Sequence, residues 1–176
     1  MRIGLISDTH IPEAGEDLWP QVYEALRGVD LILHAGDLHV PQVLDWLERL
    51  APVAAVWGNG DYLGWERTQP PTDPRLREAR VLAVDGLRIG LVHDFPLAES
   101  PPFHTVEGLM RHLFGGPVNI VVRGNTHRAE VTTYKGVLLV NPGSPTFPNH
   151  MKLRLGTVGF LEIEGGRVQA RIHQLC

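Results

Sequence analysis

The chain has 176 residues, of which 43% are hydrophobic and 20% are charged, and its formal net charge is −4 at pH 7. This length and composition are typical of one globular domain, here residues 1–176, with no apolar stretch near the ~20 residues of a membrane span. The single cysteine, Cys176, excludes an internal disulfide and a cysteine-based zinc site, and the negative charge argues against a broad nucleic-acid-binding surface.

The first third of the chain alternates strand and helix patterns. Short apolar runs at 2–7, 30–34 and 53–57 predict buried strands, while residues 18–26 and 41–50 carry apolar side chains at helical spacing. This order predicts parallel strands joined by crossover helices. The strand-like run at 2–7 follows the first residue directly, without an apolar leader and cleavage site, so we expect no signal peptide and a cytoplasmic protein.

The rest of the chain reads mainly as hairpins. Residues 69–74 are proline-rich and predict a loop, and residues 79–93 predict two strands that turn at Asp85-Gly86. A helix over 104–114 and a strand over 118–123 follow, then hairpins over 130–141 and 156–173. Two sheets packed face to face with helices outside fit this pattern better than a single parallel sheet.

Polar residues follow the apolar runs at five places in the chain. These are Asp8-Thr9-His10, Gly36-Asp37, Gly58-Asn59-Gly60-Asp61, His93-Asp94 and Gly124-Asn125-Thr126-His127. Each group alone is an ordinary turn sequence. Ligands of α/β sheets bind beyond the carboxyl ends of the strands, so the five groups together predict one convergent site. Nine histidines beside one cysteine favour a metal that is not held by thiolates.

The order of these groups resembles the calcineurin-like metallophosphoesterases. Within them the chain is similar to the small YfcE-like phosphodiesterases, which are related to the retromer metallophosphoesterase-like subunit. The resemblance rests on SDTH (7–10), HAGD (34–37), WGNGD (57–61), LVHD (91–94), GNTH (124–127) and NPGS (141–144). It implies a four-layer α/β/β/α sandwich and a hydrolase that acts on a phosphate ester, with a diester favoured over a monoester.

The resemblance also implies two divalent ions, Mn²⁺, Ni²⁺, Fe²⁺ or Zn²⁺, and assigns their ligands. Asp8, His10 and His127 would hold the first ion, Asn59 and His93 the second, and Asp37 would bridge the two. The family has a second-metal histidine where this chain has Asn125, whose neutral amide oxygen is a weaker ligand, so we expect a looser second ion. Asp37, Asn59 and His93 are then the catalytic residues, because two ions can activate a bridging hydroxide and stabilise charge on the phosphoryl oxygens.

Other residues receive more open interpretations. Gly60 stands where larger relatives have a catalytic histidine, so a proton donor would come from elsewhere, with His39 and then His104 as candidates. Asp61 either accepts a hydrogen bond from Asn59 or His10 or bonds its own turn. Trp57, Tyr62 and Phe95 either line a pocket for the leaving group or pack in the core, which is the commoner place for an aromatic residue beside a strand end. His34 is expected to pack in the core, and residues 141–144 to shape the floor of the site. His112, His150 and His173 lie in no motif and receive no role.

Two functions stay open at this point. The first is a metal-dependent phosphodiesterase, which the order of the motifs favours. The second is a metal-binding scaffold for protein interactions with weak or no activity, which Asn125 and the retromer relative favour. A homo-oligomer is compatible with both.

Overall fold

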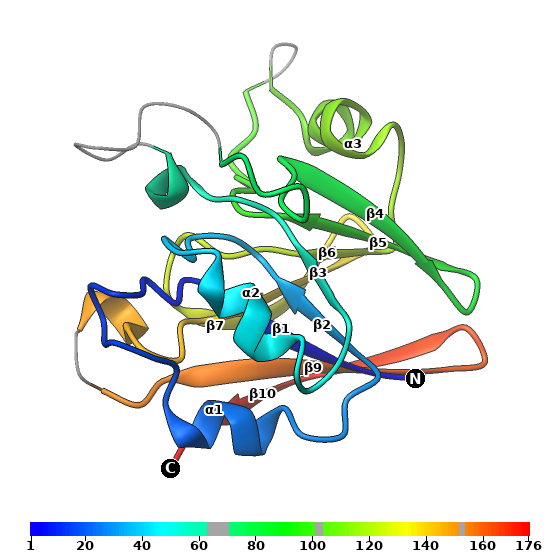
Figure 1. The fold of residues 1–176 in the computed structure, drawn as a ribbon. Coiled ribbons are helices and arrows are strands. Elements are labelled where there is room, and N and C mark those ends of the chain that lie inside the picture. The colour runs from blue at the N-terminus through cyan, green and yellow to red at the C-terminus, as the bar shows by residue number, and fades with distance from the viewer. Residues whose placement is uncertain (63–70, 101–103, 152–153) are drawn as a thin grey trace.

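The computed structural model describes residues 1–62, 71–100, 104–151 and 154–176, which form two five-stranded sheets (Figure 1). The first sheet has the order β10 (Arg167–Gln174), β9 (Thr157–Glu164), β1 (Arg2–Ile6), β2 (Leu31–His34), β3 (Val53–Ala55). The second has the order β4 (Ala79–Val84), β5 (Leu87–Val92), β6 (Ile120–Val122), β8 (Val137–Pro142), β7 (Ala129–Tyr134). The helices are α1 (Pro20–Ala25), α2 (Gln42–Leu47) and α3 (Val106–Phe114), with short 3₁₀ turns η1 (Asn59–Asp61) and η2 (Pro148–His150).

Each sheet contains three parallel strands, which lie at one side of the first sheet and at the centre of the second. They are β1, β2 and β3 in the first sheet, and β5, β6 and β8 in the second. The predicted hairpins are confirmed as β4–β5, β7–β8 and β9–β10. The parallel centre of the second sheet was not predicted: it forms because the segment that contains α3 returns the chain to the side of β5 where β6 begins. The last hairpin joins the first sheet, where β9 pairs antiparallel with β1.

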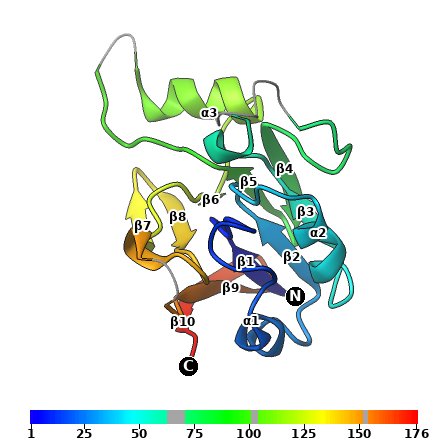
Figure 2. The ribbon, with the colours of Figure 1, turned by 60° about the vertical axis from the view of Figure 1, so that its left-hand side comes forward.

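Three apolar clusters separate four layers. One lies between α1, α2 and the first sheet and contains Leu26 and Leu44, both fully buried. The second lies between the two sheets and contains Leu5 and Leu91, and the third lies between the second sheet and α3 around Phe114. Figure 2 shows α3 on the opposite side of the molecule from α1. The predicted α/β/β/α sandwich is confirmed.

The structure corrects the start of the third helix. This helix begins at Val106 instead of His104, because the Thr105 Oγ1 accepts a hydrogen bond from the Gly108 amide at 3.0 Å and caps it. His104 lies outside the helix, in an isolated bridge with Ser100. Residues 71–74 lie outside helices and strands as expected, whereas residues 69 and 70 lie outside the described residues. Within the described chain, no helix has the length and apolar character that crossing a membrane requires.

Candidate metal centre

The loops that follow the six parallel strands meet at one edge of the sandwich. Each sheet contributes three of these loops, because β1, β2, β3, β5, β6 and β8 all end there. The His93 Nε2 lies 3.4 Å from an Asp37 Oδ2, and the His127 Nε2 lies 3.4 Å from an Asp8 Oδ1. Each contact joins a residue of the second sheet to a residue of the first, so the site lies across the junction of the two sheets.

The backbone in these loops adopts an unusual conformation. Polar residues with left-handed φ values in these loops include Asp8 at 54°, His10 at 48°, Asp37 at 57°, Asn125 at 71° and His127 at 56°. Such values are uncommon outside glycine and cost about 1–3 kcal/mol each, so they persist only where surrounding contacts hold them. Hydrogen bonds between neighbouring loops do this, from the Asp8 amide to the Gly36 carbonyl and from the His10 amide to the Asp37 carbonyl.

Asp61 joins two of the loops through their backbones. Its carboxylate accepts hydrogen bonds from the amides of Asp37 at 3.0 Å, His39 at 2.7 Å and Gly58 at 2.8 Å. The Gly58 bond belongs to its own turn, while the other two fix the loop that carries Asp37. Its recorded partners are therefore backbone groups and not the side chain of Asn59 or His10.

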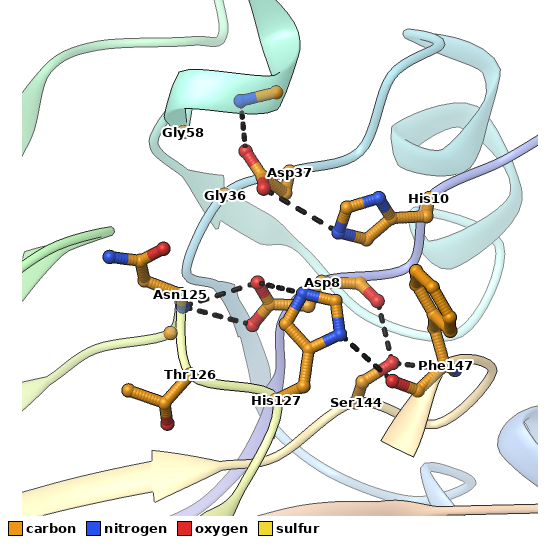
Figure 3. A network of polar contacts seen from close by, with 12 residues as sticks. Asp8, His10, Gly36, Asp37, Gly58, Asn125, Thr126, His127, Ser144 and Phe147 are labelled. Atoms are coloured by element: carbon orange, nitrogen blue, oxygen red, sulfur yellow. Dashed lines mark hydrogen bonds and ion pairs between the residues drawn. The ribbon is translucent and has the colours of Figure 1, made fainter. Parts of the chain in front are cut away.

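Four side chains form a compact group that could hold a metal ion. One ligand atom from each of Asp8, His10, Asp37 and His127 lies within 4.8 Å of the others (Figure 3). The His10 Nε2 lies 3.5 Å from the Asp37 Oδ2, which is also the oxygen that faces His93. Imidazole nitrogens with carboxylate oxygens suit Mn, Fe, Ni, Co or Zn.

Hydrogen bonds fix the orientation of two of the imidazole rings. The Nδ1 of His93 donates to the Ala35 carbonyl at 2.7 Å, and the Nδ1 of His127 donates to the Phe147 carbonyl at 2.8 Å. This leaves each Nε2 directed at a carboxylate, the arrangement common among metal-binding histidines. Among the described residues, the buried Nε2 atoms of His10 and His93 have no hydrogen-bond partner. Buried polar atoms are nearly always paired, so the donor set fits a metal ion.

Burial and charge separate the pKa values of these groups. Burial raises the pKa of Asp8 to about 7 and lowers the pKa of His10 to about 3. Burial alone would also raise the pKa of Asp37, but the neighbouring His93 imidazole lowers it to about 2. Burial alone would lower the pKa of His93, but Asp37 and Asp8 raise it to about 9. Without a metal, Asp37 and His93 therefore form a buried ion pair.

The remaining predicted ligands are His93, which faces Asp37, and the two asparagines, Asn59 and Asn125. Asn59 is exposed at η1, where it lines a cavity of about 240 Å³ together with His93 and Trp57. The Asn125 amide of the backbone donates to both Asp8 oxygens, at 3.1 and 3.2 Å, while its side chain is directed away from that carboxylate (Figure 3). The contribution of Asn125 in this structure is thus made by its backbone.

The glycines of the motifs allow close approach of the loops. A Cβ on Gly58 would lie 2.1 Å from the Asp37 Oδ1, and one on Gly124 would lie 1.9 Å from the Ser7 Oγ and 2.8 Å from the Asp8 Oδ2. Neither position accommodates even a methyl group, so each glycine is required by the backbone that crosses behind a carboxylate.

Residues 141–144 support the floor of the site together with the two residues that follow. The Ser144 hydroxyl donates to the Asp8 carbonyl and the Thr146 hydroxyl donates to the Thr9 carbonyl, each at 2.7 Å. The Asn141 side-chain amide donates to the Gly124 carbonyl at 2.8 Å. These bonds run to backbone atoms, which agrees with the predicted supporting role.

Two further histidines border the group. The ring of His39 lies 4.3 Å from the ring of His10, and its Nδ1 lies 2.7 Å from a Glu13 carboxylate oxygen. The ring of His150 lies 4.0 Å from that of His127, an association that the sequence did not predict because no motif surrounds His150.

The three aromatic residues divide between the two predicted alternatives, the pocket and the core. Trp57 and Tyr62 line the cavity next to His93, but Phe95 is fully buried and packs against Phe114 with ring centroids 6.1 Å apart. An apolar residue just after a strand end can turn back beneath the sheet as well as line the site, and here α3 provides the surface that buries it.

Comparison with known proteins agrees with this geometry. The family model described as the calcineurin-like phosphoesterase superfamily domain matches residues 1–166. A protein of Methanothermobacter thermautotrophicus described as a probable metallophosphoesterase is 37% identical over 173 residues, which cover 98% of this chain and 91% of that protein.

Solved structures share the fold over the whole chain. Wild-type Vps29 from Entamoeba histolytica, complexed with Zn²⁺, superimposes with a TM-score of 0.66 at 23% identity and covers 99% of both chains. A structure titled as a novel archaeal phosphodiesterase superimposes with a TM-score of 0.64 at 22% identity, covering 98% of this chain and 100% of the other. At these identities the two likenesses establish the fold.

Proposed function

The chain belongs to the calcineurin-like phosphoesterase superfamily, and from this membership we propose that it is a metal-dependent phosphodiesterase with a two-metal centre. Members of this family generally bind divalent metals and act on phosphate esters. The cytoplasmic location, the possible homo-oligomer and the absence of a broad nucleic-acid-binding surface stay predictions from the sequence.

The observation that carries the proposal is the set of buried imidazole nitrogens directed at two carboxylates. The Nε2 atoms of His10 and His93 are buried without a hydrogen-bond partner among the described residues, and both face the Asp37 Oδ2, at 3.5 and 3.4 Å. A carboxylate oxygen placed between two imidazoles supports the bridging role that we propose for Asp37. The group of four supports a first ion on Asp8, His10 and His127.

The second ion would rest on His93, Asp37 and Asn59, with Asn125 as a further oxygen ligand. Asn59 shares a cavity with His93, which supports its proposed place beside that histidine. Two of these ligands would be neutral amide oxygens, which are weaker ligands than carboxylates or imidazoles, so we propose that the second ion binds more weakly than the first. The mixture of imidazole and carboxylate donors supports Mn²⁺, Ni²⁺, Fe²⁺ or Zn²⁺.

The chemistry divides between the ions and the protein. When bound, two divalent ions would supply positive charge for the phosphoryl oxygens and an activated water as the nucleophile. The protein holds the Asp8 and Asp37 carboxylates in place through backbone amides and keeps the imidazoles oriented. His39 is the proposed hydrogen-bonding partner of the leaving oxygen, because its Nε2 is buried beside Gly60 and has no hydrogen-bond partner in the part of the chain that the structure describes.

A diester is the proposed substrate class. The support is the archaeal phosphodiesterase that shares the fold, together with the cavity of about 240 Å³ beside His93, which has room for one ester substituent. Trp57 and Tyr62 offer aromatic surface there for an aryl group or a nucleobase.

One assay tests the proposal. Metal-stripped protein would be supplied with Mn²⁺ or Ni²⁺ and its turnover of a bis-aryl phosphate compared with that of an aryl phosphate. We expect metal-dependent turnover, with the diester preferred. Folded protein that turns over neither ester with either metal would contradict the enzyme, and a preference for the monoester would contradict the diester assignment alone.

A metal-binding scaffold is the second candidate. It is favoured by the position of Asn125, whose side chain is directed away from Asp8, and by the shared fold with Vps29, whose structure was solved with Zn²⁺. On this reading the protein binds metal with Asp8, His10, Asp37 and His127 but does not hydrolyse esters. Metal binding measured by calorimetry without turnover would favour it.

A further inference from the structure

His34 is fully buried at the end of β2, where the sequence predicted a packing role. It lies two residues after Ile32, on the face of β2 that Ile32 contributes to the apolar cluster beneath α1 and α2, yet both of its nitrogens lie within hydrogen-bonding distance of polar groups. The Gly36 amide donates to the His34 Nδ1 at 3.2 Å, and the His34 Nε2 lies 3.3 Å from the Thr9 hydroxyl.

These two contacts fix the form of the imidazole. The Nδ1 accepts from a backbone N–H and therefore carries no proton, so the proton of a neutral ring must be on Nε2, where it can be donated to Thr9. Burial keeps the ring neutral, since it lowers the pKa of His34 to about 3. A neutral histidine with both nitrogens engaged connects the Gly36 backbone amide to the Thr9 side-chain hydroxyl.

These two groups belong to the loops that carry three of the four grouped ligands. Thr9 lies between Asp8 and His10 and is itself fully buried. Gly36 directly precedes Asp37, and its carbonyl accepts the Asp8 amide at 2.9 Å. The His34 ring thus connects the side chain of Thr9, which lies between Asp8 and His10, to the backbone amide just before Asp37.

We propose that His34 is a positioning residue, which sets the spacing of Asp8 and His10 against Asp37 and thereby the affinity for a divalent cation. The inference rests on the proposed function for the identity of the ligand, and on the two hydrogen bonds for the mechanism. An apolar side chain of similar size would fill the space but leave the Gly36 amide and the Thr9 hydroxyl without this partner. Residues that orient metal ligands typically change metal affinity about 10–100-fold when they are replaced.

Three variants separate positioning from packing. His34→Leu removes both bonds, His34→Asn keeps an oxygen that can accept from the Gly36 amide, and Thr9→Val removes only the hydroxyl partner. Ile32→Ala is the matched control, because Ile32 is fully buried, lies two residues earlier on the same face of β2 and has no polar role. The readout is Mn²⁺ affinity of metal-stripped protein by titration calorimetry, with circular dichroism to confirm folding.

We expect His34→Leu to weaken Mn²⁺ binding about 10–100-fold, Thr9→Val and His34→Asn to weaken it less, and Ile32→Ala to leave it within about twofold of the wild type. Thr9→Val should add little in the His34→Leu background, since both changes remove the same contact. If His34→Leu does not fold, the Mn²⁺ affinities of the milder variants His34→Asn and Thr9→Val test the inference.

Two outcomes overturn the inference. Unchanged Mn²⁺ affinity in folded His34 and Thr9 variants, or an equal loss in Ile32→Ala, would show that His34 only packs. A wild-type protein that binds no Mn²⁺, Ni²⁺, Fe²⁺ or Zn²⁺ would instead contradict the proposed function, and the inference with it. Metal binding without turnover leaves the inference intact, because its readout is affinity.

Discussion

Asp37 contacts residues that follow strands of both sheets. One of its oxygens faces His10 from the first sheet and His93 from the second, and the other accepts the Gly60 amide at 2.7 Å. The negative charge is therefore shared among groups from three loops. Replacing that charge while keeping the shape isolates its contribution.

Asp37→Asn is expected to lower metal-dependent kcat/KM by about a hundredfold or more, because an amide retains one acceptor oxygen but cannot neutralise two cations. Steady-state rates at several Mn²⁺ concentrations measure the effect. Asp45→Asn is the matched control, since Asp45 pairs with Arg75 on the surface and is 55% exposed. Rates of Asp37→Asn that equal those of the control would refute the bridging role.

The pKa of Asp8 is raised, whereas that of Asp37 is lowered, so the contribution of Asp8 to stability depends on pH. Its pKa is raised from 3.8 to about 7, mainly by burial. Between about pH 4 and pH 7 the unfolded chain carries Asp8 ionised while the metal-free folded protein keeps it protonated. Its contribution to stability is thus complete below about pH 4 and is lost as the pH rises through about 7.

Metal-free Asp8→Asn should therefore gain stability relative to the metal-free wild type as the pH rises from 4.5 to 7.5, by at least about 1 kcal/mol. The depressed histidine pKa values affect both proteins and largely cancel in the difference. Urea unfolding of the two proteins at both pH values measures it. A stability difference that stays constant with pH would show that Asp8 is not buried as a neutral acid.

The residue types at the site could be predicted from the sequence, but their geometry could not. Asp8, His10, Asp37 and His127 stood in motifs, and the glycines indicated tight turns. The backbone role of Asn125 and the contact of His150 with His127 depend on left-handed φ values of 71° and 59°, which no local pattern specified. Side-chain direction in such loops follows from tertiary hydrogen bonds.

Among the elements, α3 illustrates how a capping residue sets the start of a helix. The helix predicted from the sequence includes residues 104 and 105. The observed helix starts only after Thr105, whose hydroxyl replaces the missing backbone acceptor of the Gly108 amide. Its buried face, with Met110 and Phe114, covers the second sheet on the side away from the first.

Thr105→Ala should lower the free energy of unfolding by about 1 kcal/mol through loss of this cap, which corresponds to roughly 2–4 °C in Tm. Thr105→Ser keeps the hydroxyl and should retain most of the stability. Thermal unfolding of the three proteins provides the comparison, with Mn²⁺ affinity expected to be unchanged in all. An alanine variant as stable as the wild type would show that the cap contributes nothing.

The strands themselves were largely predictable, since apolar runs and turn pairs such as Asp85-Gly86 have a direct physical signature. The pairing of β9 with β1 was not, because it joins Arg2 to Glu162 across almost the whole chain. Long-range pairing depends on which sheet has an unpaired edge, and that information is distributed over the complete fold.

At the scale of the whole molecule, we propose that residues 1–176 form one domain. The cluster between the sheets draws Leu5 and Leu33 from the first half and Leu91 and Ile120 from the second. The candidate site also needs both sheets, because its loops follow strands of each. A ligand that binds there should therefore stabilise the complete fold and not one sheet alone.

Metal addition tests this coupling. A cation that binds only the folded protein adds about 2.7 kcal/mol of stability at a hundredfold excess over its Kd, which for a chain of this size raises Tm by roughly 5–10 °C. We expect this increase in a single thermal transition when Mn²⁺ is added to metal-stripped protein, and its reversal by a chelator. The Asp8→Asn/Asp37→Asn double variant should show little increase. An equal rise in the double variant would place the bound metal elsewhere, and two separate transitions would contradict the coupling of the sheets.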